Sequence, residues 1–212
     1  MTRTVEKPQY GGSLRVAIAA DYVGWDPYVT RAISVGHMQF TGNELMQGKW
    51  EIGPTGTGEE NWHVGYAARI DLEAGELAES WELPDSETII YRIRKGVKYH
   101  NKPPVNGREL TAQDVATWLQ WQFERPGLWQ NTSFPKESGM RPTSFKALDK
   151  YTVEIKVPAM SQGIMLLQMG DNAYTSPPEI WTQYGGWGSD WKKIIGTGPF
   201  ILEDYVTGSA IR

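Results

Sequence analysis

The sequence predicts a mixed α/β fold in which strands and helices are interspersed without a regular βαβ repeat. Three segments, residues 13–19, 89–93 and 151–157, alternate their side chains in the way that is typical of strands with one better-buried face. A strongly marked helix begins after Thr111. The chain of 212 residues is long enough to bury a sizeable core, as one large domain or two small ones.

The N-terminal part is expected to hold a strand, a loop and a helix, in that order. The strand covers residues 13–19, and the loop DYVGWDPY at residues 21–28 is broken by a glycine and a proline. Residues 30–46 have a helical apolar pattern. Residues 49–67 are rich in glycine and polar side chains, so we expect a long loop, and such loops are usually functional or mobile.

The helix after Thr111 has the clearest local signals. Thr111 and Asp114 stand at the spacing of a capping box, with aspartate in place of the usual glutamate or glutamine. Leu110 and Val115 occupy the positions of a hydrophobic staple. Pro126 is expected to end the helix, because proline cannot continue an α-helix without losing a hydrogen bond.

Four elements are expected in the C-terminal part. The strand at residues 151–157 is entered through a turn at 149–150, and a short helix covers 163–169. Another helix starts at Ser176, with proline in its first turn, and ends at Gly185. Residues 195–205 are expected to form a tight glycine turn that leads into a final strand.

Composition excludes several classes of protein. The net charge of −4 and the scattered basic residues argue against a nucleic-acid surface. The absence of cysteine excludes disulfides, thiolate metal sites and a cysteine nucleophile. No apolar run approaches the length of a membrane span, and the N-terminus lacks the apolar region of a signal peptide. Ten tryptophans and ten tyrosines favour a binding cleft, although aromatic residues also fill cores.

No pattern in the sequence favours catalysis, a metal or a cofactor. There are only three histidines, so a metal site around His63 and Glu60 lacks ligands. The glycine-rich stretch at 53–58 has no Gly-Lys-Ser/Thr ending for phosphate, and no G-x-S-x-G elbow occurs. A glycosidase that uses Asp21, Asp26 or Glu44 stays open as the enzymatic alternative, because two carboxyl groups can cleave a glycosidic bond.

The loop at 21–28 is the first candidate for a ligand edge. It follows a predicted strand, and in open α/β sheets ligands bind beyond the carboxyl ends of strands. Its aromatic residues offer apolar walls with polar tips, and residues 169–174 and 196–198 are expected at the same edge. The alternative is that Trp25 and Tyr28 only pack beneath the loop.

Four segments resemble one family in that family's own order. They are GGSLRVAIAADYVGWDPY, the pair LAESWEL and IIYRIRKGVKYH, the helix GRELTAQDVATWLQW, and finally ALDKYTVEIKV with IGTGPFILEDY. They resemble the family 5 extracellular solute-binding proteins, the dipeptide, oligopeptide and nickel type that serves ABC importers. The middle motif within residues 77–121 is the specific one.

The resemblance implies lobe I of a two-lobed type II periplasmic-binding "Venus flytrap" fold with an extra subdomain. Residues 10–48 and 165–212 would form the main sheet of lobe I, and residues 49–164 the extra subdomain. The family's chain normally continues into lobe II, so we expect a fragment that lacks this lobe. Both its signal segment and any lipid-bearing cysteine would then lie outside the sequence shown.

The resemblance also implies a function. The protein would capture a peptide-like or other small solute outside the cytoplasm and deliver it to an ABC permease, as a periplasmic or extracellular, membrane-anchored component. The expected ligand residues are Asp21, Tyr22, Trp25, Tyr28, Asn172 and Tyr174. The ligand stays open between peptide, opine, nickel complex and oligosaccharide. A sensor or adhesion module on the same fold is an alternative, and surface exposed by truncation is expected to favour self-association.

Overall fold

A four-stranded antiparallel sheet forms the centre of the computed structural model, which describes residues 15–17, 21–22, 24–26, 37–53, 70–186 and 190–212. The strand order is β3-β4-β6-β5. The strands are β3 (Ala78–Glu82), β4 (Thr88–Ile93), β5 (Ser144–Asp149) and β6 (Thr152–Lys156). The predicted strands at 89–93 and 151–157 are therefore confirmed as the two central strands of this sheet.

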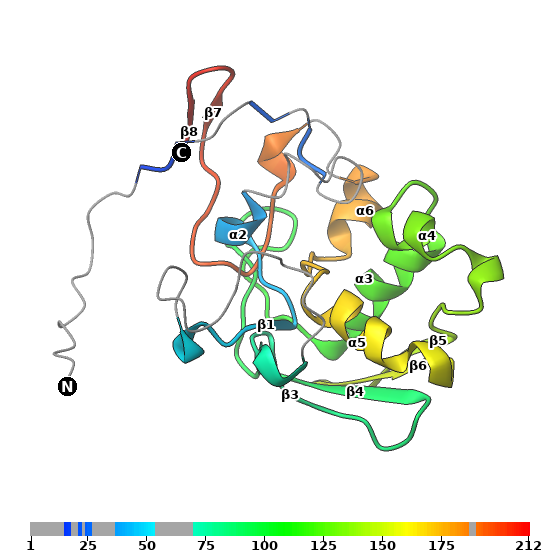
Figure 1. Cartoon of the computed structure of the whole chain (residues 1–212). Coiled ribbons are helices and arrows are strands. Elements are labelled where there is room, and N and C mark those ends of the chain that lie inside the picture. The colour runs from blue at the N-terminus through cyan, green and yellow to red at the C-terminus, as the bar shows by residue number, and fades with distance from the viewer. Residues whose placement is uncertain (1–14, 18–20, 23, 27–36, 54–69, 187–189) are drawn as a thin grey trace, which may run out of the picture.

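Helices α3 (Ala112–Glu124) and α5 (Gln162–Gly170) cover one face of the sheet (Figure 1). The strand residues that face them, such as Ile89 and Val153, are fully buried, whereas Ile90 and Glu154 on the other face are partly exposed. Tyr91 joins the two layers, because its hydroxyl donates to the carbonyl oxygen of Leu166 in α5 at 2.8 Å. The core therefore lies between the helices and a single face of the sheet.

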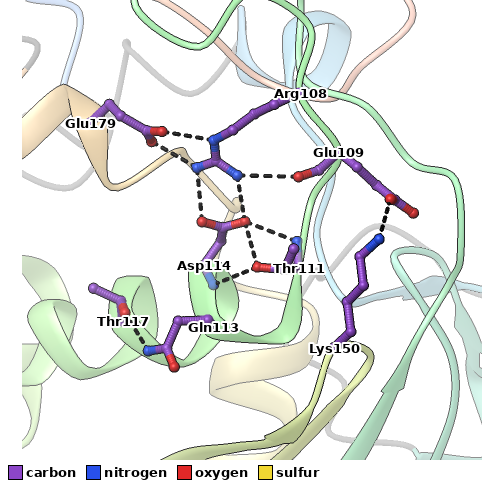
Figure 2. Close-up of polar contacts among 8 residues, drawn as sticks. All are labelled: Arg108, Glu109, Thr111, Gln113, Asp114, Thr117, Lys150 and Glu179. Carbon is purple, nitrogen blue, oxygen red and sulfur yellow. Dashed lines mark hydrogen bonds and ion pairs between the residues drawn. The ribbon is translucent and has the colours of Figure 1, made fainter.

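Helix α3 begins as its sequence predicts. The Thr111 N–H donates to the Asp114 carboxylate at 2.9 Å, and the Asp114 N–H donates to the Thr111 hydroxyl oxygen at 3.4 Å (Figure 2). These reciprocal bonds make the expected capping box with aspartate at its third position. The helix ends at Glu124, two residues before Pro126, and the short helix α4 (Trp129–Ser133) follows it.

Two predictions for the N-terminal part are wrong within the described residues. Residues 15–17 form no strand, and Val16 is 58% exposed. Within the described part of the helix expected at 30–46, only α2 (Met38–Thr41) is helical, and Met46 begins β1 (Met46–Gly48), which pairs with β2 (Glu73–Gly75). Gly42 ends α2 in an extended conformation, packed against the Tyr174 ring.

The loop expected at 49–67 is described only at its start. Residues there form a short 3-10 turn at Trp50–Ile52, and another at Ile70–Leu72 leads into β2. The remainder of that loop, residues 54–67, and the predicted elements at residues 13–14, 18–19 and 30–36 lie outside the described residues.

The C-terminal helices agree better with expectation than the final strand does. Helix α5 is confirmed, and α6 (Glu179–Tyr184) ends at Gly185, whose φ of 69° suits the expected left-handed cap. Helix α6 starts three residues later than Ser176, after two consecutive prolines. Further 3-10 turns occur at Lys136–Ser138, Ala159–Ser161 and Trp191–Lys193.

The strand expected to follow the glycine turn is mostly absent. Only Tyr205 of residues 195–205 lies in a strand, β7 (Tyr205–Val206), which forms a small hairpin with β8 (Ala210–Ile211). Two of the preceding residues bond instead to the end of α2: the Gly198 N–H donates to the Thr41 carbonyl at 3.0 Å, and the Phe200 N–H donates to the Phe40 carbonyl at 3.1 Å. Long-range contacts therefore replace the local strand.

The four-stranded sheet falls inside residues 49–164, and β1 of the preceding part pairs with β2 inside that range. The division into a main sheet and an extra subdomain stays a prediction. In the part of the chain that the structure describes, no helix has both the length and the apolar character that a membrane span requires.

Candidate ligand-binding site

Four aromatic rings gather where the predicted ligand loop meets the C-terminal hairpin. The ring of Tyr22 lies 5.0 Å from that of Trp25 and 5.3 Å from that of His37. Trp25 meets Tyr205 edge to face, with ring centroids 4.8 Å apart. Trp25 is only 3% exposed, so in this conformation it supports the partly exposed Tyr22 from behind.

Asp21 connects this loop to the hairpin β7–β8 through two hydrogen bonds. Its carboxylate accepts a hydrogen bond from the Tyr205 hydroxyl at 2.6 Å and another from the Gly208 N–H at 2.6 Å. These bonds, the first foremost, lower the pKa of Asp21, because they favour its charged form. Asp21 therefore has a clear structural role in positioning this loop against the hairpin. Tyr28 lies outside the described residues.

Asn172 and Tyr174 are held by helices α3 and α4. The Trp118 indole N–H donates to the Tyr174 carbonyl at 2.7 Å, and the Gln130 side-chain amide donates to the Asn172 carbonyl at 3.2 Å. Burial raises the pKa of the Tyr174 hydroxyl, and the nearby carboxylates raise it further. The main chain at 172–174 is thereby fixed against the helical layer.

Asn43 connects the other segments that were expected at this edge. Its side-chain oxygen accepts from the Thr197 hydroxyl at 2.9 Å, and its main-chain carbonyl accepts from the Thr175 N–H at 3.0 Å. Its side-chain amide donates to Glu76 at 2.5 Å. Thr175, the residue that follows segment 169–174, and Thr197 of segment 196–198 therefore both bond to Asn43, which the sequence did not single out.

The two halves of the predicted site lie at opposite ends of helix α2. His37 at its N-terminal end contacts Tyr22 and Trp25, and Gly42 at its C-terminal end packs on Tyr174. A four-residue helix is only about 6 Å long, so the two halves can belong to one surface. His37, Tyr205 and Asn43 were missed, since a histidine in a helical pattern and an isolated asparagine carry no motif.

Two carboxyl groups in this region, those of Asp171 and Glu73, have pKa values above the ordinary ones. Burial, together with the charges of Glu73 and Glu76, raises the pKa of Asp171 to about 7. One carboxylate oxygen of Glu73 is buried with no hydrogen-bond partner among the described residues, and burial raises the pKa of that residue too. Within the described ranges no group of three or more histidine, aspartate and glutamate side chains could hold a metal ion.

We expect Asp171→Asn to stabilise the protein at pH 8 and to leave its stability unchanged at pH 4. The pKa of Asp171 is about 7 in the folded protein against 3.8 as its ordinary value, so folding disfavours the charged form. The wild type therefore loses stability as the pH rises from about 4 to 7, whereas the asparagine variant does not. With partial exposure taken into account, the gain at pH 8 should be about 1–2 kcal/mol.

Urea unfolding of both proteins between pH 4 and 8 measures this difference. Asp149→Asn is the matched control, because hydrogen bonds, first that from the Tyr151 N–H, lower the pKa of Asp149. That variant should be less stable than the wild type by an amount that hardly changes between about pH 5 and 8, because both the folded and the ordinary pKa of Asp149 lie at or below 3.8. A pH-independent effect of Asp171→Asn would contradict the assignment.

Comparison with known proteins gives a consistent result. Residues 74–212 match the family model described as bacterial extracellular solute-binding proteins, family 5 Middle. The peptide transport periplasmic protein SapA of Salmonella typhimurium is 29% identical over 151 residues, covering 65% of this chain and 27% of that protein. A dipeptide-binding protein of Pseudomonas aeruginosa is 30% identical over 151 residues, covering 64% of this chain and 28% of that protein.

Solved structures show the same fold. The oligopeptide-binding protein AppA of Bacillus subtilis, in complex with a nonapeptide, has a TM-score of 0.67 at 21% identity, covering 97% of this chain and 36% of that one. The periplasmic binding protein DppA of Helicobacter pylori, in complex with peptide STSA, has a TM-score of 0.64 at 22% identity, covering 91% and 36%.

These comparisons confirm the mixed α/β fold of type II periplasmic binding proteins. All four relatives carry the names of transport or binding proteins, and two of them are named as periplasmic. This chain spans 27–28% of the length of the two curated relatives. The chain belongs to the bacterial extracellular solute-binding proteins of family 5.

Proposed function

We propose that this chain is part of the solute-binding component of an ABC importer, which captures a peptide and delivers it to a membrane permease. The observation that carries the proposal is the family match over residues 74–212. The names of the relatives, one a dipeptide-binding protein and another a periplasmic peptide-transport protein, support a peptide as ligand and the periplasm as location. A membrane anchor on the full-length protein is part of the proposal.

The proposed ligand surface runs along α2. Main-chain groups at 21–25 and at 172–174 would meet the backbone of the ligand, while Tyr22 and Tyr174 would supply apolar walls with hydroxyl tips. Trp25 and Asp21 would position the first loop, since one is buried and the other bonds to the hairpin. Tyr28 and Asn172 complete the proposed set.

Calorimetric titration of this chain with a dipeptide mixture tests the proposal. We expect weak, saturable binding, because the chain spans 27–28% of the length of its curated relatives and much of an enclosing surface would come from elsewhere. Tyr22→Ala should weaken binding by roughly tenfold, as loss of one aromatic contact usually costs 1–2 kcal/mol. Tyr184→Ala, at an exposed position on α6, is the control and should leave binding unchanged.

Titration with other solutes distinguishes a peptide from the other classes of ligand. Parallel titrations with opines, oligosaccharides and a nickel chelate should give no heat if the peptide is the ligand. Nanomolar binding of any of them by this chain would overturn the proposal that it carries only part of the site. If Tyr22→Ala leaves the affinity for the peptide unchanged, the binding site does not lie along α2.

We propose further that the chain has no catalytic role. Asp21 has both carboxylate oxygens engaged with the hairpin, and Asp26 is buried, so neither suits a glycosidase. Chromogenic glycosides should not be hydrolysed; turnover that disappears in Asp21→Asn or Asp26→Asn would restore the enzymatic alternative. Neighbouring permease and ATPase genes would favour transport over a sensor or adhesion module.

A further inference from the structure

A second surface lies on the side of α3 that faces β5. A groove of about 570 Å³ opens there between the C-terminal half of the helix and residues 136–146. Its floor is aromatic: the rings of Phe123 and Phe145 lie 5.8 Å apart, and Phe134 packs behind Phe123 at 6.3 Å. The groove therefore offers an apolar floor that lies outside the proposed ligand surface along α2.

Arg141 holds the wall of this groove in place. Its guanidinium donates to the carbonyl oxygens of Phe123 at 2.8 Å and Asn131 at 2.7 Å, and also to that of Phe134. Three main-chain acceptors on the end of α3 and on α4 thus fix one side chain. A groove built in this way is formed before any partner arrives, which lowers the entropy cost of binding.

The strand beside the groove is the edge strand of the sheet. In the order β3-β4-β6-β5, strand β5 pairs only with β6, and among the described residues no other hydrogen bond involves its main chain. Its residues Ser144, Phe145 and Lys146 line the groove. An open edge strand that runs beside a helix with a groove between them is the geometry in which peptides add as a further strand.

The groove is basic on an acidic molecule. Lys136, Arg141 and Lys146 line it together with a single carboxylate, Glu124, whereas the whole chain carries a net charge of −4. Within the described part of the chain none of these three cations forms an ion pair with a carboxylate. Unpaired cations around an apolar floor favour a partner with acidic and apolar side chains in alternation.

We propose that the groove between α3 and β5 is a docking site for an extended acidic segment of a partner protein. The segment adds as a strand to the edge of β5, places alternate apolar side chains over Phe123 and Phe145, and presents carboxylates to Lys136 and Lys146. A bulge between Ala147 and Asp149 limits the pairing to the first half of β5. This function is independent of the ligand proposed for the α2 surface.

Fluorescence anisotropy with a labelled hexapeptide of alternating glutamate and leucine tests the proposal. We expect saturable binding that weakens with salt, and no binding of the same hexapeptide with lysine in place of glutamate. Only every second N–H of an added strand faces β5. N-methylation of the odd-numbered residues of the peptide and N-methylation of its even-numbered residues should therefore differ: one should abolish binding and the other should not. Amide NMR shifts should centre on residues 144–147.

Charge reversal supplies the matched variants. Lys136→Glu with Lys146→Glu should weaken binding by at least about tenfold, and Lys98→Glu with Lys192→Glu, two exposed lysines outside the groove, should not. All four lysines are exposed, so circular dichroism should show both variants folded.

Three results with the peptide would overturn the proposal: no binding of the acidic peptide, equal binding by both double variants, or NMR shifts outside β5 and α3. Sedimentation could instead show that this chain forms a dimer and that only the groove variant loses it. The occupant of the groove would then be a second copy of this chain, and the proposal of a partner protein would be wrong.

Discussion

Gly196→Ala is expected to destabilise the protein by at least about 3 kcal/mol, because the new methyl group would meet main chain rather than a movable side chain. A Cβ at Gly196 would lie 2.0 Å from the carbonyl oxygen of Thr41, and one at Gly198 would lie 2.5 Å from the carbonyl carbon of the same residue. Domains are stable by only about 5–15 kcal/mol, so a loss of this size leaves a large unfolded fraction.

The glycine segment cannot move aside without losing further bonds. His100 donates its main-chain N–H to the Gly196 carbonyl at 2.9 Å, and its Nδ1 accepts the Gly196 N–H at 3.3 Å. Its Nε2 lies 2.9 Å from the Gly198 carbonyl and carries the proton, since a carbonyl oxygen can only accept. Displacing the segment would also pull the Thr197 hydroxyl away from Asn43.

Chemical denaturation of Gly196→Ala and Gly163→Ala measures the effect against a matched control. Gly163 lies in helix α5, where an added Cβ would have no neighbour within 4 Å among the described residues. Its replacement should stabilise the protein by about 0.5–1 kcal/mol, since alanine loses less backbone entropy than glycine in a helix. A change of less than about 1 kcal/mol in Gly196→Ala would show that Thr41 and its neighbours relax freely.

Elements governed by neighbouring residues could be predicted from the sequence. The capping box at Thr111 and Asp114, the glycine cap after α6 and the alternation in β4 and β6 all concern residues within a few positions of one another. Apolar periodicity also placed α5 correctly. In each case the local preference and the tertiary environment agree, so the pattern alone was sufficient.

The failed predictions have long-range causes. A strand was expected to follow the glycine turn in residues 195–205, but the main chain at residues 196, 198 and 200 bonds to His100, Thr41 and Phe40. Hairpin bonding begins only at residues 203 and 204, which bond to Arg212. Residues 42–46 continue a helical apolar pattern, yet Met46 pairs with Gly75 as part of β1. Tertiary contacts of this kind override a weak local preference.

The candidate site shows the same limit. The aromatic loop and the segments 172–174 and 196–198 were named from the sequence, but what joins them was not. Tyr205 reaches Asp21 across 184 positions, and Thr197 reaches Asn43 across 154. A single sequence carries no signal for such pairs, because each residue is ordinary in its own surroundings.

Arg108→Met is expected to destabilise the protein by about 2–4 kcal/mol, because two carboxylates lose the guanidinium that they share. Arg108 donates to both oxygens of Asp114, at 2.7 and 2.8 Å, and to both of Glu179, at 2.7 Å each (Figure 2). The side chains of Asp114 and Glu179 are only 9% and 23% exposed, so water cannot replace the lost partner well.

Arg108→Lys should recover only part of that loss. An ammonium group is a point charge and cannot present two pairs of parallel donors, whereas the planar guanidinium matches both carboxylates. Arg92→Met is the exposed control: its salt bridge to Glu82 joins side chains that are 40% and 50% exposed, and its loss should cost much less stability than the loss of Arg108.

The pH dependence separates the charge from the packing of the Arg108 side chain. The hydrogen bond from Arg108 lowers the pKa of Glu179 below its ordinary 4.5, so the pair contributes stability that is present above about pH 4.5 and is lost as the pH falls through the folded pKa. The difference between the wild type and Arg108→Met should therefore shrink in acid. The Arg108 guanidinium lies 5.1 Å from the centroid of the Tyr99 ring. If the difference in stability stays constant down to pH 2.5, Arg108 stabilises α3 and α6 through the packing of its side chain on Tyr99 rather than through its charge.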